Sequence, residues 1–246
     1  MYLILAIVFP FFVILVLLSL KNSVVRFFRK RYISLVYGRY SHQFLTFFRE
    51  NDLVTPYNGC IKDGITWHFI VFYKKIKNSQ EFQTDIPIDY GEIPFMASCK
   101  NLLKIKGNPD CIDVDTINDI KFLVVGYNET LQGLKMKSMY YFLNDQFVLG
   151  ELNFANLLHV KPTNLVGQIS SKYLNGNPVE KDVFYIADTT GNQLNYENNG
   201  FSISIKYLFK GNNATNLILS GLFGIGDNTV ENKIKALRNK ELLDRL

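Results

Sequence analysis

Cysteine, histidine and tryptophan are scarce in this chain of 246 residues, which has three cysteines, three histidines and one tryptophan. None of them follows C-x₂-C or H-x₃-H, the close spacing that zinc sites use. No Gly-x-Ser-x-Gly elbow occurs, and no phosphate-binding loop ending in Lys-Ser/Thr. The sequence therefore predicts no metal site, no cofactor and no catalytic residue, and it favours a protein that is not an enzyme.

Two weaker arrangements leave some chemistry open. Cys99 could act as a nucleophile with a distant histidine as its base, although a free cysteine usually serves as a small buried hydrophobe. Asp110, Asp113, Asp115 and Asp119 could supply oxygen ligands to calcium, but their order does not match an EF-hand loop. The alternative interpretation is that these acids keep a turn and an edge strand soluble.

Charge is absent from the first twenty residues. Met1 to Leu20 is apolar nearly throughout and is long enough, as a helix, to cross about 30 Å of hydrocarbon. A buried core helix and a cleaved signal peptide are the alternatives. No basic residue precedes this stretch and no A-x-A-like site follows it, so the pattern favours an uncleaved signal-anchor and a single-pass membrane protein.

Positive charge gathers directly after this stretch. Residues 1–80 carry eleven Lys and Arg against three acids, whereas residues 81–246 carry sixteen against nineteen. By the positive-inside rule the large domain lies in the cytoplasm, and an odd number of cysteines fits that reducing compartment. Basic charge beside an apolar anchor indicates attraction to the anionic headgroups of a lipid bilayer rather than to nucleic acid. The predicted membrane-surface binding residues are Lys21, Arg26, Arg29, Lys30 and Arg31.

The residues from Val24 to Tyr37 have the periodicity of an amphipathic helix. The cations gather on one side, while Val24, Phe28, Tyr32 and Leu35 gather on the other. Such a helix can lie in the headgroup plane of a membrane. The alternative is that it packs on the folded domain with its cations in solvent. The apolar residues from Phe44 to Phe48 are expected to serve a core.

The remainder of the chain predicts an α+β fold, in which an antiparallel-sheet domain with short helices follows the single transmembrane helix. Helices are expected over 98–106 and 164–174, each followed by a Gly-Asn-Pro stop and a strand meander, which suggests a duplicated α-β-β-β unit with halves 90–155 and 160–210. The polar stretch 78–92 is expected to be a loop. Strands are expected at 67–73, 120–127, 135–143, 147–154, 183–187, 193–196 and 201–209, with Asn144-Asp145 as a tight hairpin turn between 135–143 and 147–154. The expected domains are 1–20 (anchor), 21–50 (basic segment), 51–226 (α+β domain) and 227–246 (C-terminal helix).

A short motif after the first of these helices carries a family resemblance. The helix, then Lys106-Gly107-Asn108-Pro109-Asp110, then an aromatic strand meander resembles the small α/β module of the SmpA/OmlA (BamE-like) and β-lactamase-inhibitor-protein group. The resemblance covers residues 90–209. It implies a protein-binding module without catalysis.

Together these features predict a membrane-anchored, non-enzymatic module that binds another protein. One alternative is an accessory subunit of a larger membrane complex. Another is a membrane-bound enzyme whose site is assembled from dispersed residues.

Overall fold

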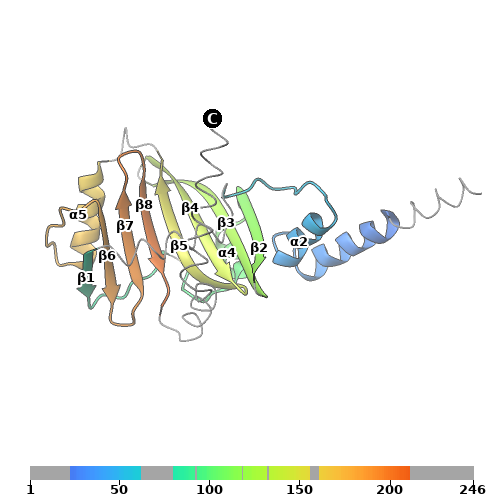
Figure 1. The fold of residues 1–246 in the computed structure, drawn as a ribbon, viewed down its shortest axis with the longest axis horizontal. Helices are drawn as coiled ribbons and strands as arrows, with labels where there is room; N and C mark the ends of the chain where they lie inside the picture. The colour runs from blue at the N-terminus through green and yellow to red at the C-terminus, as the bar shows by residue number, and fades with distance from the viewer. Residues whose placement is uncertain are drawn as a thin grey trace, which may run out of the picture. The chain divides into compact units, whose positions relative to one another are not determined.

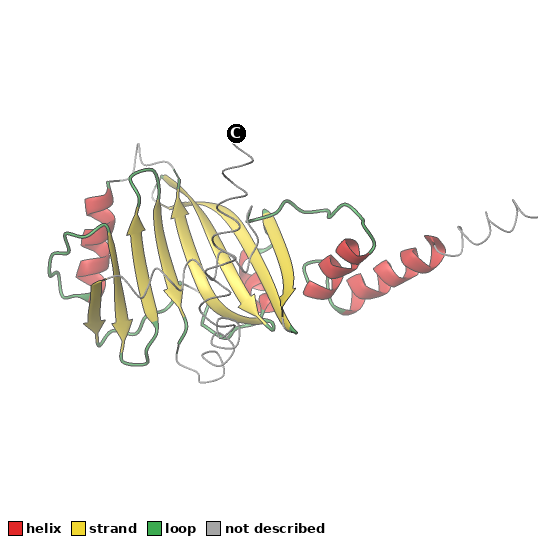
Figure 2. Ribbon diagram, in the orientation of Figure 1, coloured by secondary structure: helices red, strands yellow, loops and turns green. Residues whose placement is uncertain are grey.

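The chain divides into two compact units, Met1–Pro56 and Tyr57–Leu246 (Figure 1). The computed structural model describes residues 23–61, 80–91, 93–117, 119–131, 133–155 and 161–210. The described part of the first unit contains a helix over residues 23–36 and α2 (His42–Glu50). The described part of the second unit contains one β-sheet and two helices, which Figure 2 separates by colour.

Within the described residues the sheet has eight strands in the order β1-β6-β7-β8-β5-β4-β3-β2. Two antiparallel meanders, β3-β4-β5 and β6-β7-β8, meet where β5 pairs with β8. The strands are β1 (Gln80–Thr84), β2 (Cys111–Ile117), β3 (Ile120–Leu131), β4 (Leu134–Leu143), β5 (Gln146–Phe154), β6 (Val183–Asp188), β7 (Gln193–Asn198) and β8 (Ile203–Leu208).

The sheet is mixed, because β1 pairs with β6 in parallel while the other neighbours are antiparallel. The prediction of an antiparallel-sheet domain is therefore wrong, and the loop expected over 78–92 is wrong at residues 80–84, which form β1. β1 reads QEFQT, in which Phe82 is the one apolar side chain, so the alternation that identifies a strand from sequence is missing. An edge strand can form with so little apolar character because its pairing is supplied by the neighbouring strand.

Local sequence signals did predict several other elements. The helix expected over 98–106 is α4 (Cys99–Lys106), and Gly107 ends it with φ +77°. The turn expected at Asn144-Asp145 joins β4 to β5, and both residues have positive φ, as a two-residue hairpin turn requires. Helix stops and tight turns depend only on residues that are neighbours in the chain. They can therefore be predicted from the sequence.

Both helices of the second unit cover the same face of the sheet (Figure 1). α5 (Pro162–Tyr173) contributes Ile169 and Tyr173 to a core that includes Phe154, Phe184 and Tyr196 of the strands. On the same face, α4 is tied to β3 by the Tyr127 hydroxyl, which donates to the Gly107 carbonyl, and by the Lys106–Glu129 ion pair at 2.6 Å.

The opposite face of the sheet carries a second core and a disulfide bond. Phe122, Val124, Tyr141 and Leu149 belong to this core, and Ile61 packs against it. Cys60 and Cys111 are bonded, with their Cα atoms 5.1 Å apart. The odd number of cysteines therefore includes a bonded pair, which a sequence separation of 51 hides because no short spacing reveals it. The argument for a reducing compartment loses its support.

The predicted transmembrane helix over 1–20 and the predicted C-terminal helix over 227–246 lie outside the described residues, as does the expected strand at 67–73. Within the described residues, no helix is long and apolar enough to cross a membrane. Helix 23–36 is short for a 30 Å span and carries four cations. This finding contradicts the prediction of a single-pass membrane protein with a cytoplasmic domain, and that prediction is not pursued below.

Candidate functional site

In the first unit, helix 23–36 packs on α2. Ser41 caps α2, since its hydroxyl accepts a hydrogen bond from the Phe44 backbone N–H at 3.1 Å. Phe44, Leu45, Phe47 and Phe48 of α2 are buried, as residues 44–48 were expected to be. Ile33 is the buried residue that helix 23–36 contributes.

Two cations of helix 23–36 lie over aromatic rings of α2. The Arg29 guanidinium lies 5.7 Å from the centre of the Phe47 ring, and the Lys30 ammonium lies 4.8 Å from the centre of the Phe48 ring. Each such cation–π contact contributes about 0.5–1 kcal/mol at an exposed site. Arg26 and Arg31 are exposed, and Lys21 lies outside the described residues. The role predicted for these five cations at a lipid surface stays a prediction.

The apolar side of helix 23–36 is exposed to solvent. Phe28 is 65% exposed and Leu35 is 82% exposed, values that are ordinary for lysine but not for large apolar side chains. Phe27 and Phe28 contact each other edge to face, with ring centres 5.8 Å apart. The exposed apolar side chains of this helix are Val24, Val25, Phe27, Phe28, Tyr32, Leu35 and Val36. Several large apolar side chains exposed on one helix are typical of an interaction site.

We call this surface the apolar face of helix 23–36, and Arg31 lies within it. Phe27, Arg31 and Leu35 follow one another at intervals of four, so the guanidinium lies between the two apolar side chains on one stripe of the helix. The face therefore presents one fixed positive charge in a mostly apolar surface.

The residues considered for catalysis are Cys99 and a histidine as its base. Cys99 begins α4 and is buried, and burial, with a smaller effect of Asp145, raises the pKa of its thiol to about 12. A neutral buried thiol is a poor nucleophile. His42 lies on α2 in the other unit, and His68 and His159 lie outside the described residues.

The four aspartates considered for calcium flank or lie on edge strand β2, and each serves local structure. Asp113 accepts hydrogen bonds from the backbone N–H groups of Cys60 and Ile61 at 2.6 and 2.8 Å, and burial raises the pKa of its carboxyl. Asp110 accepts from the Asn128 backbone N–H at 2.6 Å. Asp115 accepts from the Thr116 N–H, while Asp119 occupies the turn before β3 with φ +63°. Among the described residues, no group of three or more Cys, His, Asp or Glu could hold a metal ion.

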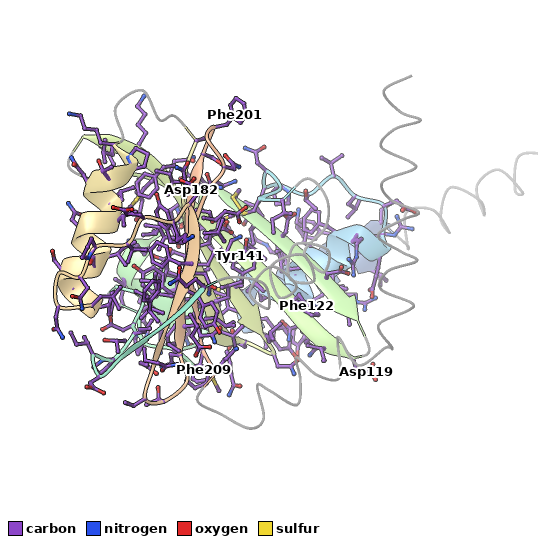
Figure 3. All side chains as sticks on the ribbon, turned by 60° about the vertical axis from the view of Figure 1, so that its left-hand side comes forward. Asp119, Phe122, Tyr141, Asp182, Phe201 and Phe209 are labelled. Carbon is purple, nitrogen blue, oxygen red and sulfur yellow. A yellow bond between two sulfur atoms is a disulfide. The ribbon has the colours of Figure 1, made fainter. Side chains whose placement is uncertain are left out.

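A buried polar network crosses the centre of the sheet and was not foreseen. Glu151 on β5 is 2% exposed, and its carboxylate accepts hydrogen bonds from the Tyr141 hydroxyl at 2.7 Å and the Ser204 hydroxyl at 3.0 Å. The Lys206 ammonium lies 3.8 Å from the same carboxylate. Tyr141 is labelled in Figure 3 among the side chains of the sheet. Burial, and then Glu151, raises the pKa of Tyr141 well above its usual range, so the phenol remains a donor. Because these groups bind one another, the network indicates a structural role.

Comparison of the chain with family models, with curated proteins and with solved structures finds no match. The resemblance of residues 90–209 to the SmpA/OmlA and β-lactamase-inhibitor-protein group therefore stays a prediction.

Proposed function

We propose that this protein is a non-enzymatic interaction module that docks onto a protein partner through the apolar face of helix 23–36. One observation carries the proposal: Phe28 and Leu35 are mostly exposed although α2 offers the helix a packing surface on its other side. Burying a side chain of this size contributes roughly 1.5–3 kcal/mol, so a partner that covers several of them gains substantial affinity. The predicted resemblance to a group of protein-binding modules supports the same class of function.

The partner surface that fits this face is an apolar groove containing one carboxylate. Helices that dock into grooves use side chains at i, i+3, i+4 and i+7, the spacing of Val24, Phe27, Phe28 and Arg31. Arg31 favours a protein groove over hydrocarbon, because a groove can place a carboxylate against the guanidinium, whereas burying an arginine in lipid costs about 2.5–3.5 kcal/mol.

Photo-crosslinking in the native host tests the proposal. A benzophenone amino acid replaces Phe28 or Leu35 in the full chain, and a matched control replaces Lys104, which is exposed on α4 of the other unit. We expect the first two positions to form an adduct with the same protein and the control to form none. We expect Arg31→Glu to abolish the adduct, because it sets a negative charge against the groove's carboxylate.

Two results would contradict the proposal. The first is the absence of any adduct at Phe28 and Leu35. The second is co-sedimentation of the chain with phosphatidylglycerol vesicles, lost in Phe28→Asp, in the absence of a protein adduct. In that case a lipid surface covers the face. Phe28 and Leu35 are exposed, so neither substitution disturbs the two cation–π contacts with α2.

A further inference from the structure

A pocket of about 410 Å³ lies against α5 in the second unit. One face of α5 forms one wall, the segment 176–182 forms another, and Tyr196 of β7 lines it from the sheet. A volume of this size falls in the range of small-molecule sites. Apolar side chains in the lining come from Pro162, Val166, Pro178 and Val179, and small residues come from Thr163, Gly167, Ser170, Ser171 and Gly176.

Tyr196, one of the residues that line this pocket, has a hydroxyl without a hydrogen-bond partner in the part of the chain that the structure describes. The residue is 1% exposed, its ring stacks on Phe184 with centres 5.1 Å apart, and its hydroxyl has no hydrogen-bond partner among the described residues. Burial, with a smaller effect of Asp182, raises the pKa of this phenol to about 12, so it keeps its proton at neutral pH. Buried hydroxyls are nearly always paired, because an unpaired one loses its hydrogen bonds to water without replacement. An acceptor atom in the pocket would supply the missing partner.

The charges at the pocket indicate which acceptor fits. Glu180 and Asp182 contribute two carboxylates and Lys181 contributes one ammonium, and all three side chains are exposed. Asp182, labelled in Figure 3, precedes β6 and accepts a hydrogen bond from the Asn198 side-chain amide at 2.9 Å. A net negative rim disfavours an anionic ligand, and the apolar walls disfavour a strongly hydrated one.

We infer that this pocket binds a small, uncharged and largely apolar molecule whose carbonyl oxygen accepts a hydrogen bond from the Tyr196 hydroxyl. The pocket belongs to the second unit and the apolar face of helix 23–36 to the first. A negative result for one proposal therefore leaves the other unaffected. The apolar body of the ligand contacts Val166, Pro178 and Val179, and the carbonyl oxygen lies toward the sheet.

Gly167 offers a way to close the pocket without disturbing the core. A Cβ atom built at Gly167 meets no heavy atom within 4 Å, and its φ lies outside the positive range that favours glycine. Gly167→Leu therefore places a side chain on the pocket wall, in a helix where leucine is more favourable than glycine. Tyr196→Phe is the complementary variant, because it removes only the hydroxyl.

Saturation-transfer NMR on the full chain tests the site, with cyclohexanone as the neutral probe and cyclohexanecarboxylate as its anionic counterpart. We expect saturable binding of cyclohexanone, weaker or absent binding of the carboxylate, a loss of affinity of about three- to tenfold in Tyr196→Phe, and no binding in Gly167→Leu. Far-UV circular dichroism and urea unfolding verify that both variants are folded.

The inference is overturned if cyclohexanone shows no saturable binding, or if its affinity is unchanged in Tyr196→Phe. Tighter binding of the carboxylate than of the ketone would also overturn it, because the acidic rim would then not control the choice of ligand. Should Gly167→Leu fail to fold, the ratio of cyclohexanone affinities between wild type and Tyr196→Phe still tests whether the Tyr196 hydroxyl binds the carbonyl oxygen.

Discussion

The aromatic ring of Tyr90 occupies the space that a side chain at Gly150 would need. A Cβ atom built at Gly150 lies 2.4 Å from the Cγ and Cδ1 atoms of Tyr90, a separation that packed atoms do not adopt. The Tyr90 hydroxyl donates to the Glu151 carbonyl at 3.0 Å, and the ring contacts Tyr140 and Tyr207 with centres 5.1 and 5.2 Å away. The segment before α4 is thus held on the sheet by one aromatic side chain seated over a glycine.

Gly150→Ala is expected to destabilise the protein by about 1–3 kcal/mol or more, because Tyr90 is 5% exposed and has no free space to move into. Urea unfolding measures the change in the free energy of unfolding. Gly167→Ala is the matched control, since it faces open space within α5 and is expected to stabilise by up to about 1 kcal/mol. Equal effects of the two substitutions would contradict the packing described for Tyr90.

Asp188 joins the β6–β7 hairpin to the segment after β1. One carboxylate oxygen accepts from the Thr190 N–H, the Thr190 hydroxyl and the Asn192 N–H at 2.7–2.9 Å, and the other accepts from the Ile88 N–H at 2.9 Å. Asp188→Ala leaves several donors unpaired and is expected to cost about 2–4 kcal/mol in unfolding free energy. Asp188→Asn keeps one acceptor oxygen and is expected to cost less. The exposed Asp85→Ala serves as a control, and a loss as large there would refute this role of Asp188.

The disulfide between Cys60 and Cys111 predicts a definite count of thiols. In denaturant without reductant, alkylation is expected to label Cys99 alone, and after reduction it labels all three cysteines, as mass spectrometry can establish. Closing a loop of 51 residues stabilises by about 4 kcal/mol in the chain-entropy estimate, so reductant is expected to lower the urea midpoint of unfolding. Three labelled cysteines before reduction would show that the bond does not form.

Gly126 on β3 leaves the space that the sulfur atoms of this disulfide occupy. A Cβ atom at this position would lie 2.4 Å from the Cys111 sulfur and 3.1 Å from the Cys60 sulfur, so the pair needs a glycine opposite it on β3. The sequence contains all three residues, but they are far apart in the chain, and nothing local to any one of them reveals the other two. Contacts of this kind are set by the pairing of strands.

The same distinction explains which parts of the fold could be predicted. The Asn144-Asp145 turn and the Gly107 helix stop were readable because a positive φ restricts the residue type at a single position. β1 was missed because its place beside β6 depends on a pairing across about a hundred residues, with Phe82 as its one apolar contribution. The amphipathic pattern of helix 23–36 was visible, but its Phe47 and Phe48 partners were assigned only to a core.

Removing one partner of the buried Glu151–Lys206 ion pair is expected to cost more stability than replacing both partners by apolar residues. Glu151→Ala leaves the Lys206 charge without this carboxylate and is expected to cost about 3–5 kcal/mol. Glu151→Gln preserves the shape and an acceptor for Tyr141 and is expected to cost less. The double variant Glu151→Met with Lys206→Met is expected to recover much of the loss, because no charge is then left buried. A double variant as unstable as the sum of its single variants would contradict this interpretation.

Buried tyrosines are expected to make the protein sensitive to alkaline pH. Burial raises the pKa of Tyr173 and Tyr196 to about 12, and it also raises the pKa of Tyr90 and of Tyr141 well above the usual range. An unfolded tyrosine ionises near pH 10, so above that pH the unfolded state releases protons that the folded state retains. The stability from these groups is therefore complete below about pH 9 and falls as the pH rises from 10 toward 12. Urea unfolding between pH 8 and 11, with phenolate absorbance at 295 nm, measures this loss, and Tyr196→Phe is expected to make it shallower. Complete ionisation of all fourteen tyrosines near pH 10 in the folded protein would show that their hydroxyls reach solvent.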